Sequence, residues 1–112
     1  MIGDDHTYTS SGGFVGGVDN GISAEGSTVL TGSQNVASAS YSCVVGGGEN
    51  DASGLYSAVG GGFLNTASGP FSSVSGGSAN TASGTDSSVS GGGGGSAPDF
   101  QDWVAGSLFE DD

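Results

Sequence analysis

Few side chains in this chain could carry out chemistry, and they do not form a complete catalytic or ligand set. His6 is the only histidine, and it follows Asp4 and Asp5. Two carboxylates and an imidazole are suitable ligands for a cation. No further ligands stand at a regular spacing from these three residues, so a metal site has little support. We instead expect residues 1–10 to form an N-terminal arm that reaches onto a partner.

Other motifs that often indicate catalysis are incomplete. Cys43 is the only cysteine, so no internal disulfide can form, and we interpret it as a small space-filling residue. The runs Gly46–Gly48 and Gly91–Gly95 are not followed by the lysine of a phosphate-binding loop. No serine or cysteine nucleophile is placed near His6 in a triad pattern. We therefore predict that the protein is not an enzyme and carries no cofactor and no metal.

The charge of the chain narrows the class of partner. It has twelve acidic residues and no lysine or arginine, which gives a formal net charge of −12 at pH 7. Such a surface repels phosphates, so we exclude nucleic acids and anionic membranes as partners. A basic protein surface is a better match, and the alternative is that the charge serves only solubility in water. The chain shows neither a secretory signal nor an apolar run long enough to cross a bilayer, so we expect no export by the usual route.

A repeat of fifteen residues organises most of the chain. Its rows start at Ser11, Gly26, Tyr41, Tyr56, Phe71 and Asp86. The fourth position of each row is a large apolar residue, and the tenth position is asparagine in the five complete rows. These residues are Phe14, Val29, Val44, Val59, Val74 and Val89, and Asn20, Asn35, Asn50, Asn65 and Asn80. So short a period means that each row buries its apolar side by stacking on its neighbours.

The repeat predicts an all-β fold, a parallel β-solenoid or β-roll of about six fifteen-residue coils over residues 11–95. Serine at the second position and valine at the fourth alternate with variable residues, as in a strand with one face inward. A second short strand covers the tenth to twelfth positions, and glycine-rich corners connect the two strands. The valines then form the core, and the stacked asparagines form a hydrogen-bonded ladder.

The predicted core is thin, because each coil contributes about one valine and one alanine. Small folds with little buried apolar area usually need a partner, so we predict self-association. The first position of three consecutive rows is aromatic and lies opposite the valines, and the fifth position is apolar in the first three rows. The alternative is that the rings cover a corner of their own coil. The predicted interface consists of Tyr41, Tyr56, Phe71, Val15, Leu30 and Val45.

Residues 96–112 have a different composition from the repeat. Ser96 and Asp99 suit the first turn of a helix. Large apolar residues follow at helical spacing, so we predict a short C-terminal helical tail. Two functions stay open for it: it could cap the end of the solenoid, or it could dock onto another protein. The residues that would pack are Phe100, Trp103, Val104, Leu108 and Phe109.

The rows Tyr56–Gly69 and Phe71–Gly84 share the pattern aromatic-Ser-x-Val, Gly-Gly and Asn-Thr-Ala-Ser-Gly. This pattern resembles the head repeats of trimeric autotransporter adhesins, and similar repeats occur in phage fibres and other virion proteins. The resemblance covers residues 11–95 and implies a left-handed parallel β-roll in each chain of a homotrimer. The sequence shows no counterpart of the adhesins' signal peptide, coiled-coil stalk and membrane anchor, so we do not expect display on a cell surface.

The repeat also looks like the short repeats of grass ice-binding β-rolls, whose binding face is flat and rich in Thr and Val. Here the eleventh position is irregular and includes a charged residue. It holds Gly21, Val36, Asp51, Thr66 and Thr81.

These observations lead to one main functional prediction and two alternatives. The main prediction is a non-enzymatic structural protein, an acidic homotrimeric β-solenoid that a terminal segment attaches to a larger assembly. A virion or other extracellular particle is the favoured setting, with the chain as a capsid decoration or cement protein or a short fibre. This setting follows from analogy with the resembling families. The alternatives are an adhesin or receptor-binding module and, third, an ice-binding protein.

Overall fold

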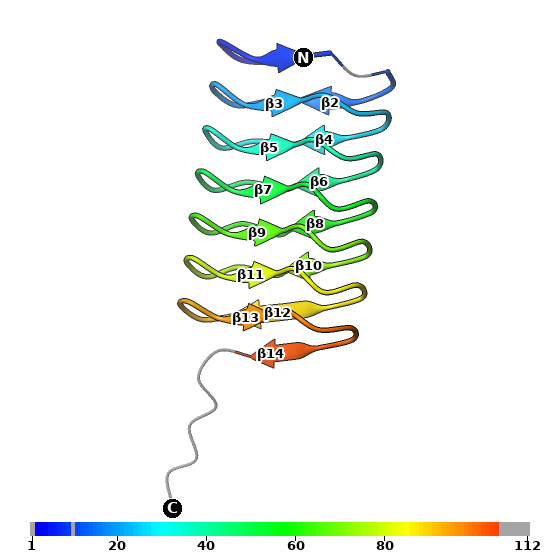
Figure 1. The fold of residues 1–112 in the computed structure, drawn as a ribbon. Helices are drawn as coiled ribbons and strands as arrows, with labels where there is room; N and C mark the ends of the chain where they lie inside the picture. The colour runs from blue at the N-terminus through cyan, green and yellow to red at the C-terminus, as the bar shows by residue number, and fades with distance from the viewer. Residues whose placement is uncertain (1, 10, 106–112) are drawn as a thin grey trace, which may run out of the picture.

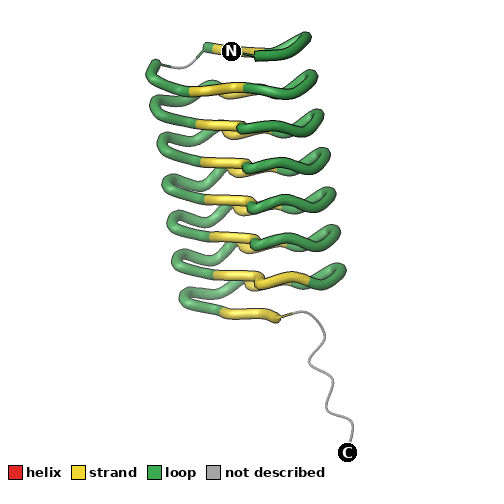
Figure 2. The backbone as a smooth tube through the Cα atoms, turned by 180° about the vertical axis from the view of Figure 1, so that it is seen from behind, coloured by secondary structure: helices red, strands yellow, loops and turns green. Residues whose placement is uncertain are grey.

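The computed structural model describes residues 2–9 and 11–105 of the chain. They form an all-β solenoid of about seven turns, with two parallel seven-stranded sheets back to back and no helix in these residues (Figures 1 and 2). One sheet, the first sheet, contains β1 (Thr7–Tyr8), β3 (Gly21–Ile22), β5 (Val36–Ala37), β7 (Asp51–Ala52), β9 (Thr66–Ala67), β11 (Thr81–Ala82) and β13 (Ser96–Ala97). The other, the second sheet, contains β2 (Phe14–Val15), β4 (Thr28–Val29), β6 (Cys43–Val44), β8 (Ala58–Val59), β10 (Ser73–Val74), β12 (Ser88–Gly91) and β14 (Trp103–Ala105).

The predicted parallel β-solenoid is therefore confirmed. Consecutive strands of each sheet pair in register, and Val44 pairs with Val59 fifteen positions further on. Because side chains alternate along a strand, one residue of each short strand points inward and its neighbour points out. Every inward position then stacks on the same position of the next coil, which explains why residue types repeat along the sequence.

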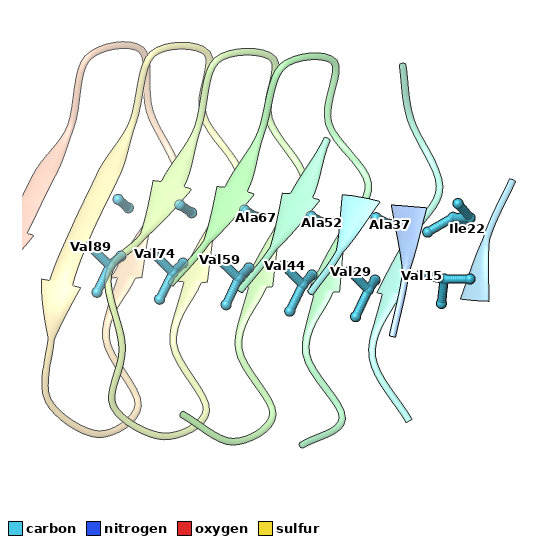
Figure 3. Close-up of a cluster of buried hydrophobic side chains, with 12 residues drawn as sticks. Val15, Ile22, Val29, Ala37, Val44, Ala52, Val59, Ala67, Val74 and Val89 are labelled. Atoms are coloured by element: carbon cyan, nitrogen blue, oxygen red, sulfur yellow. The ribbon is translucent and has the colours of Figure 1, made fainter. Parts of the chain in front are cut away.

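The core is a double column of small apolar side chains between the sheets (Figure 3). The second sheet contributes the valines and the first sheet contributes Ile22 and the alanines. The thin core predicted from the repeat is confirmed, and all the predicted valines from Val29 to Val89 lie in it. Its buried members are Val15, Ile22, Val29, Ala37, Val44, Ala52, Val59, Ala67, Val74, Ala82, Val89 and Ala97.

One prediction about the first row is wrong. Val15 pairs with Val29 and is fully buried, so it belongs to the core and not to the predicted interface. Phe14 pairs with Thr28 and points outward. The physical reason is that the corner at Gly16 and Gly17 has one residue fewer than the same corner of the next coil. The distance along the chain from Val15 to its partner Val29 is therefore fourteen residues and not fifteen.

The predicted N-terminal arm is also wrong for the part that the structure describes. Residues 2–9 form a coil of the solenoid, because β1 pairs in parallel with β3 and Asp4 bridges to Val18. The Ile2 amide extends this pairing by donating to the Val15 carbonyl over 2.8 Å. The repeat is hidden here because the lap to the next coil is again fourteen residues long.

The predicted helical tail is wrong for residues 96–105. Ser96–Ala97 forms β13, which pairs with β11, and Trp103–Ala105 forms β14, which pairs with β12. Between them, the Asp102 amide donates to the Asp99 carbonyl and closes the same tight turn as in earlier coils. The spacing of the apolar residues Phe100, Trp103 and Val104 fits a helix, but in the structure it arises from a turn followed by a strand. Leu108 and Phe109 lie outside the described residues.

Candidate interaction surface

The asparagine column is a buried structural ladder, as predicted. The backbone amide of Asn50 donates to Asn35 Oδ1, and Asn50 Oδ1 in turn accepts from the Asn65 amide, both over 3.0 Å. Asn50 Nδ2 donates to the carbonyls of Gly46 and Gly62 over 2.9 and 3.0 Å. The ladder thus runs through side-chain to backbone bonds, and one direct amide pair joins Asn80 Nδ2 to Asn65 Oδ1. These bonds satisfy the buried amides, so the column offers nothing to a ligand.

His6 occupies the asparagine position of the first coil, which the sequence did not reveal. Its Nδ1 accepts the Asn20 amide over 3.3 Å, and its Nε2 lies 2.8 Å from the Ile2 carbonyl. The imidazole therefore takes part in the ladder. Among the described residues no group of three His, Cys, Asp or Glu could hold a metal ion, so the cluster with Asp4 and Asp5 is not supported as a site.

The predicted aromatic residues form one continuous stack on a corner of the rod. The Tyr41 and Tyr56 ring centroids are 5.1 Å apart with planes at 12°, and those of Tyr56 and Phe71 are 5.4 Å apart at 2°. About half of each side chain is exposed. Tyr41 donates to Glu25 Oε1 over 3.3 Å, and the Glu25 carboxylate raises the pKa of Tyr41. We call these three residues the aromatic stack.

The backbone of the aromatic stack shows that the turn itself does not need rings. Tyr41, Tyr56 and Phe71 have φ values of 59°, 57° and 59° in the left-handed region. This conformation costs an L-residue roughly 1–2 kcal/mol, and Gly26 holds the same position in the preceding coil. Asp86 also fills this position one coil later. Aromatic side chains are therefore an additional feature, placed on a turn that other residues can form.

The aromatic stack adjoins the outer face of the second sheet. Leu30 and Val45 are exposed on this face, as predicted, and Phe14 joins them in place of Val15. Across the described coils the outward positions of this sheet include no carboxylate. They are Phe14, Gly16, Thr28, Leu30, Cys43, Val45, Ala58, Gly60, Ser73, Ser75, Ser88, Ser90, Trp103 and Ala105. We call this surface, together with the aromatic stack, the uncharged face.

The first sheet presents a different outer face. Its two outward columns carry hydroxyls in several coils, including Thr66 with Ser68 and Thr81 with Ser83. Asp51 interrupts them: its Oδ1 is buried without a hydrogen-bond partner, and burial raises the pKa of the carboxyl. A hollow of about 260 Å³ lies beside Gly21 on this face. Its lining includes the polar residues Thr7, Asp19, Asn20 and Ser23.

The predicted docking residues are divided between the core and the surface. Val104 packs against the core below Val89. Phe100 and Trp103 are about two thirds exposed, and Trp103 Nε1 donates to Ser90 Oγ over 2.8 Å. Val104 therefore extends the core by another coil, whereas the two rings are on the surface.

A scan of the chain against protein-family models finds no match, and a search among curated proteins finds none either. Within the described part of the chain, no helix is long and apolar enough to cross a membrane.

Proposed function

We propose that this chain is a non-enzymatic structural module, a self-associating acidic β-solenoid that serves as a rigid rod in a larger assembly. A homotrimer on the surface of a virion, as a decoration protein or short fibre, is the setting we favour. The observation that carries the proposal is the uncharged face on a chain whose formal net charge is −12. Two identical acidic surfaces repel one another, so contact between copies is most favourable on the face with the fewest carboxylates.

The composition of the uncharged face supports contact between copies. Leu30, Val45 and the aromatic stack leave large apolar side chains in water, which is typical of interaction surfaces. Tyrosine and phenylalanine are also enriched at such surfaces because a rigid ring buries much area at little entropic cost. The narrow core gives each chain little other apolar burial, so association would add to its stability.

The test is the mass of the full chain in solution, measured by sedimentation equilibrium across the micromolar range. We expect a trimer for the wild type and dissociation for Tyr56→Asp, because a charge then enters the contact. Asp86 occupies the same turn position, so the backbone tolerates this change. Ser68→Asp adds the same charge to the opposite face and should stay trimeric. A monomeric wild type, or equal dissociation of both variants, would overturn the proposal.

A second candidate is surface binding of the ice-binding type, which the hydroxyl columns of the first sheet favour. Thr66, Ser68, Thr81 and Ser83 project from adjacent coils on one face. Asp51 and Gly21 break the columns, so the regular area is short. Thermal hysteresis of the wild type, lost in Thr81→Asp, would support this candidate. An adhesin role stays a prediction without a specific observation in its favour.

A further inference from the structure

The aromatic stack ends at a carboxylate. Tyr41, Tyr56 and Phe71 occupy the same turn position in consecutive coils, and Asp86 occupies it in the next coil. The φ of Asp86 is 59°, as at Phe71. The Asp86 amide donates to the Pro70 carbonyl over 2.9 Å, and the Phe71 amide makes the same bond one coil earlier over 2.8 Å. Asp86 therefore stands in register with the rings, at the place where a fourth ring would stack.

The two ends of the aromatic stack differ. Gly26 lies beyond Tyr41, and the Tyr41 ring is so close that a Cβ on Gly26 would be 2.7 Å from its Cδ1 atom. The Tyr41 hydroxyl also donates to Glu25 Oε1, so both the ring face and the carboxylate are occupied at this end. At the other end the ring of Phe71 is followed only by the short side chain of Asp86, and Phe71 is 55% exposed. The stack is thus closed at Tyr41 and open at Phe71.

The carboxylate at the open end is available to a ligand. Asp86 is exposed, and its side chain makes no hydrogen bond to another residue in the described part of the chain. The sequence contains no lysine or arginine, so neither this chain nor a second copy can supply such a side chain. A lysine or arginine at this place must therefore come from a different molecule, and the formal net charge of −12 attracts one.

An aromatic face beside a carboxylate matches arginine better than any other side chain. The guanidinium is planar, stacks on aromatic rings and binds a carboxylate through two parallel N–H bonds. A guanidinium paired with Asp86 would lie parallel to the Phe71 ring and would continue the stack in the same direction. Gln101, exposed at the same turn position one coil further on, adds a neutral acceptor on the other side. Lysine is a point charge without a plane, so it would use the carboxylate alone.

We propose that Phe71 and Asp86 form a binding site for an arginine side chain of a basic partner protein. The site goes beyond the self-association proposed above and does not depend on it, because both residues belong to one chain. Contact between copies would use the ring edges that point away from the rod. The arginine site instead uses a ring face that points along the stack. The uncharged face and the arginine site can therefore serve different partners.

Binding of N-acetyl-arginine amide to the full-length chain tests the site. The measurement is a ¹H NMR titration at low salt, because salt screens exposed charges. A guanidinium on the Phe71 face places the neighbouring Hδ protons of the ligand in the shielding region of the ring. We expect these protons to shift upfield and the Phe71 ring resonances to move until the site is saturated. N-acetyl-lysine amide carries the same charge and should bind several-fold more weakly.

Three variants separate the parts of the site. Asp86→Asn should weaken binding of the arginine ligand about fivefold, because the charged bonds are lost while asparagine tolerates the left-handed turn. Asp19→Asn removes the same charge from an exposed corner and should leave the affinity nearly unchanged. Phe71→Leu should abolish the upfield shift of the ligand. Leu64 has a φ of 58°, so leucine is compatible with a left-handed corner of this chain.

Three results would overturn the proposal. Equal weakening by Asp86→Asn and Asp19→Asn would mean that net charge alone attracts the ligand. Equal affinity for the lysine and arginine ligands would mean that the planar group is not recognised. Ligand Hδ protons that do not shift upfield on the wild-type chain would place the guanidinium away from the ring, and this measurement needs no variant to fold. The sedimentation mass tests self-association separately, so failure of one proposal leaves the other standing.

Discussion

Tyr56 and Phe71 stack almost parallel, with their ring centroids 5.4 Å apart and their planes at 2°, although both residues have left-handed backbone conformations. Stacking of this kind contributes about 0.5–1.5 kcal/mol beyond burial, which is close to what the left-handed φ costs. Tyr56 also stacks on Tyr41, so for this central ring two stacking contacts stand against the cost of one left-handed conformation. The stability of a variant that lacks one ring therefore shows whether the ring supports its own turn or serves a partner.

The first prediction is that Tyr56→Gly leaves the isolated chain about as stable as the wild type. The variant loses the stacking contacts with Tyr41 and Phe71, about 1–3 kcal/mol together, and relieves one left-handed conformation of about 1–2 kcal/mol, so the two changes should offset each other to within about 1 kcal/mol. Denaturant unfolding at low protein concentration, where chains do not associate, measures this difference. A loss above about 2 kcal/mol would show that the rings cover their own corner, which is the alternative explanation of the aromatic stack.

The second prediction concerns the ladder. Asn50→Ala should reduce the free energy of unfolding by about 3 kcal/mol, because the Asn65 amide and the Gly46 and Gly62 carbonyls would lose a buried partner. Gln34→Ala is the matched control, since Gln34 is an exposed corner residue and Ala79 fills the same corner position. Urea titration of both variants measures the effect. Equal, small losses in the free energy of unfolding of the two variants would contradict the prediction and would mean that water replaces the amide.

The third prediction concerns the corner glycines. Gly47 has φ +84°, and a Cβ there would lie 2.1 Å from the Gly62 carbonyl oxygen. Gly47→Ala should therefore force neighbouring coils apart and lower the melting temperature substantially. At Gly76 a Cβ would meet no atom within 4 Å, and Thr31 fills the same position of an earlier coil. Gly76→Ala should melt like the wild type, and similar melting of both variants would contradict the prediction.

The interior of the solenoid could be predicted from the sequence because each inward position stacks on its own kind. Val44 and Asn50 each contact the residue at the same position of the neighbouring coils. The repeat in the sequence therefore predicts these contacts directly. The sequence of one chain does not determine the number of copies in the assembly. An outward aromatic residue such as Tyr56 can recur because it covers its own turn or because it contacts a partner. The homotrimer therefore stays a prediction.

The ends of the repeat were harder to predict. In the first row Phe14 and Val15 are both apolar, so the sequence alone did not show that a shorter corner places Val15 inward. At the other end, the spacing of Phe100 and Val104 fits a helix as well as a turn and strand. His6 was missed as a ladder member because an imidazole does not look like asparagine in a sequence, although it offers an acceptor and a donor at similar positions.

The last prediction concerns Asp51, the charged residue in the outward column of the first sheet. Burial raises the pKa of Asp51, and its Oδ1 has no hydrogen-bond partner. The folded chain thus binds the proton more tightly than the unfolded chain does. The ionised carboxylate therefore lowers the free energy of unfolding. This loss of stability is absent below the ordinary carboxyl pKa near 4, and it develops as the pH rises from there through the raised value.

Asp51→Thr should remove this penalty, because threonine occupies the same column at Thr66 and Thr81. We expect a gain of about 1 kcal/mol in the free energy of unfolding at pH 7, small because solvent screens a side chain that is only partly buried. The gain should shrink toward pH 3, where Asp51 is protonated in both states. Asp19→Asn removes one charge from an exposed corner and controls for the lower net charge. A gain that is equal at pH 3 and pH 7 would show that threonine acts through strand preference and not through the carboxylate.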